Sequence, residues 1–221
     1  MSSAPLQPVF DRLLAHFGPL HWWPAESPFE VVIGAILTQN TAWTNVEKAI
    51  ANLRRAEALT PEALRVAPRA QLEEWIRPAG FFRQKAERLQ LFVDHLVTRH
   101  NGDLGHLLAA PLPEARRELL ALKGVGPETA DSILLYAGGL PSFVVDAYTR
   151  RLFGRLGLLD PTAPYETIRD FFMERLPADP DLFNEYHALI VEQCKQLCRK
   201  RRPLCTDCPL QELCPFAESQ K

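Results

Sequence analysis

The chain has 221 residues, of which 47% are hydrophobic and 24% are charged, and its formal net charge is −2 at pH 7. This is the composition of an ordinary globular protein, long enough for one large domain or two modest ones that share a core. No run of about 18 apolar residues is present, which argues against a membrane-spanning chain. Residues 1–5 lack the basic start of a signal peptide, so we expect a cytoplasmic protein.

The local signals predict an all-α fold. No segment alternates polar and apolar residues over the length of a strand, and no internal repeat is present. The prolines lie mostly where segments begin or between them, as expected for short helices with tight connections. Helices are expected in four places: after a capping box at residues 44–47 (TNVE), from Thr60-Pro61 onward, over residues 85–100 up to Asn101-Gly102, and over residues 165–176.

Four of the five cysteines are grouped in the pattern Cys198-x6-Cys205-x2-Cys208-x5-Cys214. In a protein inside the cell, such grouping favours a metal site over disulfide bonds. Four thiolates can hold either a tetrahedral zinc ion or a [4Fe-4S] cluster, and ligand chemistry alone does not decide between them. Cys194 lies outside the pattern and is expected to be a small, buried residue of a helix.

Residues 122–130 (LKGVGPETA) predict a turn between two helices. Gly124 and Gly126 permit a tight turn with positive φ and a close approach of other atoms to the backbone. Pro127 then begins a helix whose first N–H groups point outward, an arrangement that binds phosphate oxygens without reading base sequence. Taken alone, a Gly-x-Gly turn is more often purely structural.

After a break at residues 138–141 (GGLP) the chain continues as residues 143–151 (FVVDAYTRR). With the preceding turn, this resembles the helix-hairpin-helix, Gly/Pro and Asp motif of DNA glycosylases, and the cysteine spacing resembles the cluster loop of the endonuclease III type. The resemblance runs from about residue 28 to about residue 216. It implies that Asp146 is the catalytic aspartate and that the four cysteines hold a [4Fe-4S] cluster. Asp146 is also expected to cap the helix that begins at Ala147.

Glu128 departs from the pattern of the bifunctional endonucleases III. In those proteins a lysine at this position attacks the sugar, forms a Schiff base and enables strand cleavage. Glu128 has the family's spacing to Asp146, but a carboxylate cannot form a Schiff base. Three interpretations stay open: a monofunctional glycosylase, a weak bifunctional one that uses another amine, and a DNA-binding relative without catalysis.

Two aromatic segments are candidates for the walls of a base-binding pocket, residues 21–24 (HWWP) and residues 36–43 (ILTQNTAW). They are similar to the endonuclease III-like 3-methyladenine DNA glycosylases, a branch with glutamate in place of the lysine. The resemblance implies that a flipped alkylpurine stacks on these side chains. A purine alkylated at N3 or N7 is cationic, and the face of an indole ring favours a cation by about 0.5–2 kcal/mol. Packing in the core is the alternative for each tryptophan. The expected pocket residues are Trp22, Trp23, Pro24 and Trp43.

The expected DNA contacts come from four places in the chain. Gln39 matches the glutamine that fills the gap left by a flipped nucleotide, and Phe81 is placed to act as an apolar wedge. Phe81 or its neighbour Phe82 is expected to pack inward instead. Lys195 and the run at 199–202 concentrate basic charge in a chain with a net charge of −2. The set is Gln39, Phe81, Lys123, Gly124, Val125, Gly126, Arg199, Lys200, Arg201 and Arg202.

We therefore expect an all-α, two-lobed fold with the DNA groove between the lobes. Residues 26–140 should form a helical barrel that contains the hairpin, and residues 1–25 with 141–221 should form the lobe with the cluster. The expected function is monofunctional release of 3-methyladenine-like bases from damaged double-stranded DNA, by a nucleoid-associated monomer with no membrane partner. The alternatives are a glycosylase for oxidised pyrimidines or mismatches with weak or no lyase activity, and a damage-binding protein without turnover.

Overall fold

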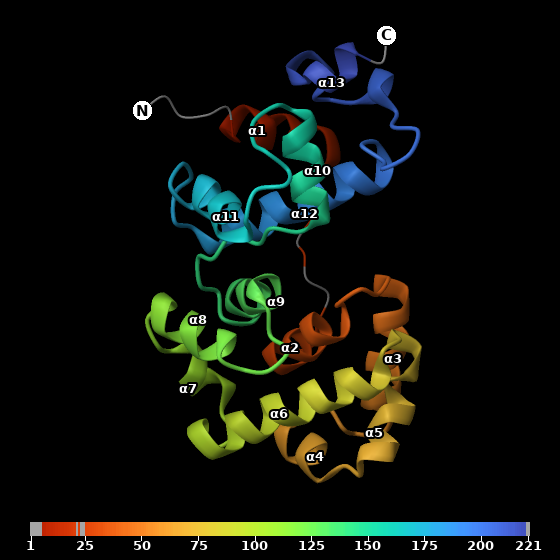
Figure 1. Ribbon diagram of the computed structural model, residues 1–221, viewed down its shortest axis with the longest axis vertical. Helices are drawn as coiled ribbons and strands as arrows, with labels where there is room; N and C mark the ends of the chain where they lie inside the picture. The colour runs from red at the N-terminus through yellow and green to blue at the C-terminus, as the bar shows by residue number, and fades with distance from the viewer. Residues whose placement is uncertain (1–5, 21, 23–24, 220–221) are drawn as a thin grey trace. The chain divides into compact units, whose positions relative to one another are not determined.

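The three-dimensional structure is a computed structural model that describes residues 6–20, 22 and 25–219. Its regular elements are helices, with no β-strand in these residues, and the all-α prediction is confirmed (Figure 1). Within the same residues, no helix combines the length and the apolar character needed to span a bilayer. The chain divides into two compact units, Met1–Trp22 with Pro141–Lys221, and Trp23–Leu140. We call them the first and the second unit.

The second unit is built around α2 (Pro28–Leu37), whose residues from Phe29 to Leu37 are all buried. Its sequence, PFEVVIGAIL, is apolar on nearly every side, as expected of a helix in the middle of a core. Ser27 begins the helix, because its side chain accepts the N–H of Glu30 at 3.1 Å. Around α2 lie α3 (Trp43–Arg55), α4 (Pro61–Val66), α5 (Arg69–Trp75), η1 (Arg77–Ala79), α6 (Phe82–His100), α7 (Leu104–Leu108), α8 (Leu112–Leu120), α9 (Pro127–Ser132) and the π-helical segment η2 (Ile133–Ala137).

The ends of these helices show where local sequence signals predicted a helix boundary correctly. α6 ends at His100, before Asn101, as predicted, and Asn101 is left-handed, but the helix begins at Phe82 and not at residue 85. The predicted capping box at residues 44–47 is wrong. α3 begins at Trp43, and its N-cap, Ala42, makes no side-chain hydrogen bond. Trp43 packs against the core of the unit as the first residue of the helix, so tertiary packing fixes this start.

The first unit packs α1 and α10 against α12. Aromatic rings fill its interior: Phe143 stacks on Phe172 with centroids 4.0 Å apart, and the edge of Tyr186 faces both rings. The hydroxyl of Tyr186 donates to the carbonyl of Leu6 at 2.7 Å and so holds α1 in place. The elements of this unit are α1 (Leu6–Phe17), α10 (Ala147–Arg155), α11 (Tyr165–Met173), α12 (Pro180–Gln196), η3 (Cys205–Asp207), η4 (Gln211–Leu213) and α13 (Pro215–Glu218).

Candidate active site

Asp146 is the N-cap of α10, as the sequence predicts. Its Oδ1 accepts the backbone N–H of Thr149 at 2.7 Å and the Thr149 hydroxyl at 3.0 Å. Its backbone is extended, with φ −112° and ψ −174°, while the next residue is already helical. An aspartate at a helix start is favoured both by the unpaired N–H groups and by the helix dipole. The side chain is therefore held rigidly, with only 15% of it exposed.

His187 lies on the other side of the same carboxylate. Its Nε2 is 3.6 Å from Oδ2 of Asp146, and its side chain is 7% exposed. Desolvation raises the pKa of the Asp146 carboxyl group, but His187 and Thr149 together lower it by more, so the pKa lies below its ordinary value. Asp146 is consequently ionised throughout the neutral pH range.

Trp22 is the described residue of the predicted tryptophan pair, and it belongs to the same group. Its ring stacks on His187 with centroids 5.9 Å apart and an interplanar angle of 14°. Lys195 places its Nζ 5.5 Å from the centroid of the same ring. Trp22 thus lies against the imidazole that contacts Asp146. Trp23 and Pro24, the other predicted pocket residues of this segment, lie outside the described residues.

The hairpin turn precedes α9 in the second unit. Gly124 has φ +87°, which requires glycine, but Gly126 has an ordinary φ of −91°, so the prediction of positive φ at Gly126 is wrong. A single left-handed residue is enough to reverse the chain, after which Pro127 begins α9. Val125 lies in the turn and is buried, with 8% exposure.

Gln39 makes its contacts with this turn. Its Nε2 donates to the Gly124 carbonyl and to the Thr129 hydroxyl, each at 2.9 Å, and its Oε1 accepts from Arg88. The predicted role in filling the gap in DNA would require Gln39 to give up these three hydrogen bonds. The sequence offered no sign that Arg88 takes part.

Glu128 lies in the first turn of α9, where a carboxylate favourably meets the positive end of the helix dipole. Lys123, the nearest lysine in the sequence, is exposed on the other side of the turn and forms an ion pair with Glu87. A contact of Lys123 with phosphate therefore requires exchange of this partner. α9 itself carries no amine.

Trp43 borders a cavity of about 200 Å³ in the second unit, together with Glu30, Glu47 and Arg54. Its Nε1 donates to Glu47 at 2.9 Å, which fixes the orientation of the indole. Glu30 is buried and accepts two hydrogen bonds from Arg54, at 2.8 and 2.9 Å. Trp43 is only partly buried, so one of its faces packs on the core while it also lines a cavity.

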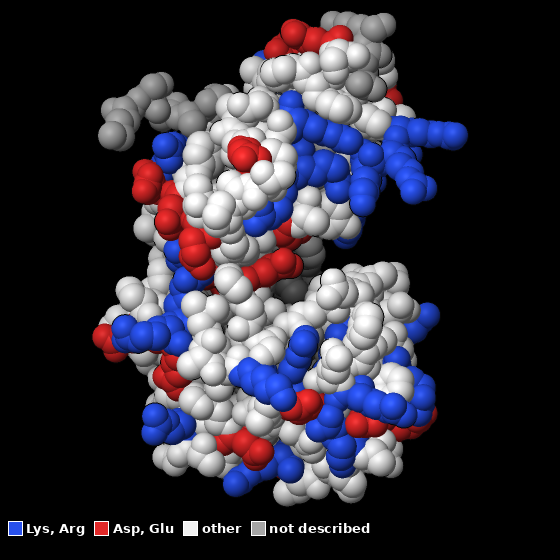
Figure 2. All heavy atoms as spheres, viewed as in Figure 1, with Lys and Arg blue, Asp and Glu red and all other residues white. Residues whose placement is uncertain are grey.

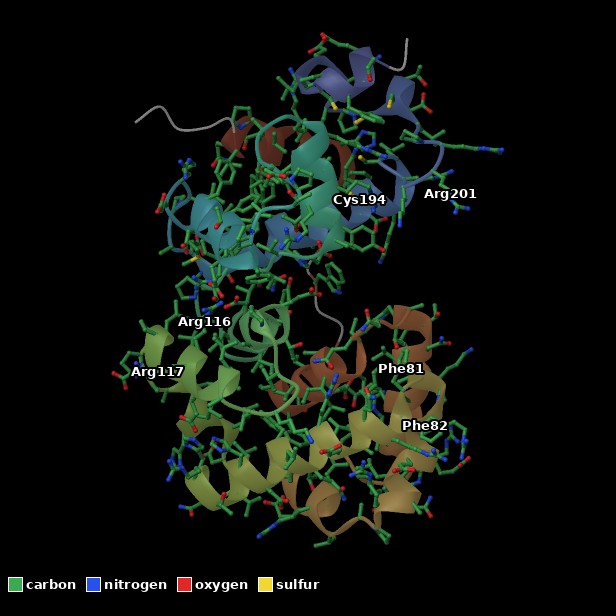
Figure 3. The ribbon with its side chains drawn as sticks, in the orientation of Figure 1. Phe81, Phe82, Arg116, Arg117, Cys194 and Arg201 are labelled. Carbon is green, nitrogen blue, oxygen red and sulfur yellow. The ribbon has the colours of Figure 1, made fainter. Side chains whose placement is uncertain are left out.

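Phe81 and Phe82 face different surroundings at the start of α6 (Figure 3). Phe81 is 65% exposed and adopts a left-handed conformation with φ 46°. Phe82 is the one that packs inward, against the core of the second unit and under the guanidinium of Arg77. A left-handed phenylalanine is unusual and costs energy, so its exposure marks a functional candidate.

The four predicted cluster ligands line one apolar hollow in the first unit. Arg155 Nη1 lies 3.2 Å from the sulfur of Cys198, and Gln193 Nε2 lies 3.1 Å from that of Cys208. A hydrogen bond with Cys194 is the largest effect that lowers the pKa of the Cys198 thiol, and Arg155 adds to it. The N–H groups of Arg155 and Gln193 suit sulfur ligands in the thiolate form. The set is Cys198, Cys205, Cys208 and Cys214.

The spacing of these sulfurs is wider than a single zinc ion needs. Zinc–sulfur bonds of about 2.3 Å in a tetrahedron place sulfurs about 3.8 Å apart. Among the described residues, which include all four cysteines, no three cysteine sulfurs lie within 4.8 Å of one another. Cys194 is buried in α12, as predicted.

The basic loop that follows α12 (residues 199–202) is exposed and is held through its backbone. Arg155 donates to the carbonyl of Arg199 at 2.9 Å and to that of Lys200 at 3.4 Å. Figure 2 shows lysine and arginine side chains gathered on this part of the first unit, and Figure 3 shows Arg201 extending away from the loop. Arg202 has a positive φ of 53°, which turns the chain toward Cys205.

These features are those of a helix-hairpin-helix DNA glycosylase, and comparisons with known proteins agree. Residues 33–178 match the family model of the HhH-GPD superfamily base excision DNA repair proteins. A provisionally assigned DNA repair glycosylase of Methanocaldococcus jannaschii is 47% identical over 208 residues, 93% of this chain and 94% of its own. Endonuclease III of Thermotoga maritima is 33% identical over 189 residues, 86% of this chain and 83% of its own.

Solved structures show the same relationship. Endonuclease III in a non-covalent complex with DNA has a TM-score of 0.84 and 25% identity, covering 100% of this chain and 98% of that one. The 3-methyladenine DNA glycosylase of H. pylori, bound to 1,N6-ethenoadenine, has a TM-score of 0.75 and 28% identity, covering 89% of this chain and 98% of that one. The chain therefore belongs to the HhH-GPD superfamily and is an endonuclease III-like DNA glycosylase of base excision repair.

Proposed function

We propose that this glycosylase is monofunctional and releases alkylated purines, principally 3-methyladenine-like bases, by hydrolysis. The observation that carries the proposal is a rigid, ionised Asp146 in a chain whose hairpin ends in Glu128. The carboxylate can stabilise the cationic sugar as the bond to the base breaks, and it can orient a water molecule. Because no amine follows the hairpin turn on α9, the Schiff-base route to strand cleavage has no nucleophile there.

The reaction balances without a metal or a redox partner. The leaving base takes the electron pair of the glycosidic bond, the water oxygen forms the new bond to the sugar C1′, and one water proton is released. A base alkylated at N3 or N7 already carries a positive charge and leaves as a neutral molecule, so it needs little acid catalysis. Asp146 is ionised and cannot protonate a leaving group, which favours substrates of this kind.

The surroundings of Trp43 support the choice of a cationic purine. Its indole borders the cavity of about 200 Å³, and Glu30 and Glu47 line the same cavity. An electron-rich ring beside carboxylates attracts a positively charged base, and Arg54 offsets only part of the negative charge. The similarity to the 3-methyladenine DNA glycosylase of H. pylori supports an alkylated purine as the substrate. We assign Trp22 to the substrate side of the first unit because its ring stacks on His187, which contacts Asp146.

Contacts with double-stranded DNA are proposed for the turn at residues 123–126 and for the basic loop at residues 199–202. Backbone N–H groups at the start of α9 suit a phosphate oxygen, and the exposed basic side chains add charge that is independent of base sequence. Phe81 is proposed as the wedge in the opened base stack, since it is exposed beside Gly80. Gln39 would enter the gap left by the base.

The four cysteines are proposed to hold a [4Fe-4S] cluster. The six-two-five spacing resembles the cluster loop of the endonuclease III type, and the N–H donors beside two of the sulfurs suit thiolate ligands. A cluster there would fold residues 198–214 and so position the basic loop. Visible absorbance with a brown colour in the purified protein, lost on replacement of Cys208 by alanine, is the expected result. A colourless protein that contains stoichiometric zinc would contradict it.

The experiment for the activity uses duplex DNA that carries methylated purines. Freed bases are quantified by mass spectrometry, and strand breaks are counted with and without later alkali. We expect release of 3-methyladenine, with breaks only after alkali and no complex trapped by borohydride. Cutting of DNA with oxidised pyrimidines, without release of methylated purines, would instead favour ordinary endonuclease III activity.

Asp146→Asn tests the chemistry, and Asp160→Asn is its matched control. Both carboxylates accept hydrogen bonds from the N–H and the hydroxyl of a threonine, but Asp160 is exposed at a turn and only Asp146 has a histidine partner. We expect Asp146→Asn to abolish base release while binding to an abasic-site duplex persists, and Asp160→Asn to keep both. Turnover close to normal in Asp146→Asn would overturn the proposal.

A further inference from the structure

A cluster of two histidines and one glutamate lies in the second unit, outside every part of the site described above. His95 and His100 are on the last turns of α6, and Glu118 is on α8. The Nε2 atom of each imidazole is 2.6 Å from the same carboxylate oxygen, Oε1 of Glu118. The three atoms lie within 4.8 Å of one another, and among the described residues this is the group of His, Cys, Asp and Glu that meets that condition.

The cluster is supported by the fold but open to solvent. The side chains of His95, His100 and Glu118 are 20%, 16% and 29% exposed, so they are held yet reachable. They line a hollow of about 640 Å³ on the surface of this unit. An ion can therefore reach the three ligand atoms without any rearrangement of the backbone.

We propose that His95, His100 and Glu118 form a binding site for a divalent transition-metal ion, with zinc as the expected ion. Two imidazole nitrogens and one carboxylate oxygen are a ligand set that zinc takes readily, with a water molecule in the fourth position. Bonds of about 2.0–2.2 Å in a tetrahedron require ligand atoms about 3.3 Å apart. The present 2.6 Å separations need to open by less than an ångström, which partly exposed side chains can accommodate.

The charges around these three side chains affect how tightly they bind the metal ion. A zinc ion held by two neutral imidazoles and one carboxylate keeps one positive charge. Glu114 lies one turn before Glu118 on α8 and lines the same hollow, so it can neutralise that charge or supply a fourth ligand. Arg99 and Arg117 also line the hollow and oppose binding, and Figure 3 shows Arg117 on α8. We expect a dissociation constant in the micromolar range.

The position of the site gives it a role in the second unit. A bound ion would join the end of α6 to α8, and the chain passes from α8 directly into the hairpin turn at residues 122–126. α6 also carries Arg88, which contacts Gln39 beside that turn. The ion would therefore fasten together two helices that support the hairpin, so it should stabilise the unit without taking part in base release.

Titration with cobalt(II) alone, monitored by its visible spectrum, tests the site in the full-length protein. Cobalt bound by nitrogen and oxygen gives weak visible bands, while cobalt bound by the cysteines adds intense near-ultraviolet thiolate bands. We expect one cobalt ion per chain without thiolate bands. We also expect zinc to displace it and to raise the melting temperature by about 5 °C at saturation.

His100→Gln and Glu118→Gln should both lose this ion and the melting shift, while each retains a group that can hydrogen-bond within the cluster. His106→Gln is the matched control, because His106 pairs with Asp103 at 3.5 Å on the same unit but has no third ligand. It should bind as the wild type does. No binding below millimolar cobalt, or binding that survives both His100→Gln and Glu118→Gln, would overturn the proposal. The measurement uses no DNA, so it is independent of the proposed base release.

Discussion

Lys85 joins the two loops that carry Gln39 and Phe81, and its replacement by methionine is the sharpest test of the second unit. The side chain is 1% exposed. Its Nζ donates to the carbonyl of Leu37 at 2.8 Å, to the Thr41 hydroxyl at 2.7 Å and to the carbonyl of Ala79 at 2.8 Å. An ammonium group has three N–H donors, so all three acceptors are satisfied at once. Lys85→Met keeps the length of the side chain and removes all three bonds.

The magnitude has two parts. At neutral pH, loss of the donors leaves the Leu37 carbonyl without this partner, whereas the Ala79 carbonyl keeps a bond from Thr41. An unsatisfied buried carbonyl costs about 1–3 kcal/mol. Burial also disfavours the charged ammonium in the folded state, which offsets part of this loss, so we expect Lys85→Met to lower the free energy of unfolding by at most about 1–3 kcal/mol at pH 7.

The second part depends on pH. Burial lowers the pKa of Lys85 to about 8 from 10.5, and the nearby charge of Arg88 adds to this effect. Between these two pH values the unfolded chain binds more protons than the folded one, so the stability of the wild type rises with pH. From pH 7 to roughly pH 9.5 the free energy of unfolding of the wild type rises by about 2 kcal/mol from this effect. Lys85→Met lacks this rise, because methionine does not titrate. The stability gap between the two proteins should therefore widen by that amount.

Urea unfolding followed by circular dichroism at a series of pH values measures this gap. Lys48→Met is the control, because Lys48 is exposed on α3 and its replacement should leave a curve parallel to that of the wild type. Parallel curves for Lys85→Met and the wild type would refute the argument. A gap that narrows as the pH rises would also refute it.

Three further predictions use the same unit. Asp131→Asn should lower the free energy of unfolding by about 3–5 kcal/mol in urea, because Asp131 is fully buried and accepts two bonds from Arg116, at 2.8 and 3.1 Å. The asparagine amide nitrogen cannot accept one of these bonds, and Arg116 would lose its counter-charge. Gly124→Ala should weaken binding to duplex DNA and lower stability, since φ is +87° and a Cβ would lie 2.5 Å from a side chain of α6, whereas Gly126→Ala should leave stability nearly unchanged. Glu128→Lys should yield a complex with DNA that borohydride traps, through a Schiff base between the new lysine and the sugar. If no complex is trapped, the local geometry prevents the lysine from attacking the sugar.

The sequence was most informative where two signals met at one position. Pro127 after a glycine turn predicted the start of α9, and Asn101 followed by Gly102 predicted the end of α6. Asp146 was predicted both as a cap and as the functional carboxylate, and its cap geometry is present. In each case the signal is local, because the side chain or the backbone angle acts on N–H or C=O groups within a few residues.

Residues whose roles depend on distant packing were missed. His187 lies on α12 and reaches Asp146 only because α10 packs against α12, and nothing near residue 187 in the sequence indicates this. The predicted helix over residues 85–100 assigned no role to Lys85 or Arg88, although one is buried and the other contacts Gln39. The start of α3 at Trp43 was also set by packing, which overrode the capping box.

The surroundings of Asp146 limit which substrates the proposed chemistry can serve. A buried carboxylate tends to become protonated, but His187 and the hydrogen bonds from Thr149 keep this one ionised. An ionised carboxylate stabilises a cationic sugar and cannot donate a proton to the departing base. With Glu128 in place of an amine, the proposed route has no covalent step, so its rate depends on how readily the base leaves. Alkylated purines leave readily because they are already cationic. The proposed preference for such bases therefore follows from a carboxylate held in its charged state and from one substitution at the hairpin, without any change of fold.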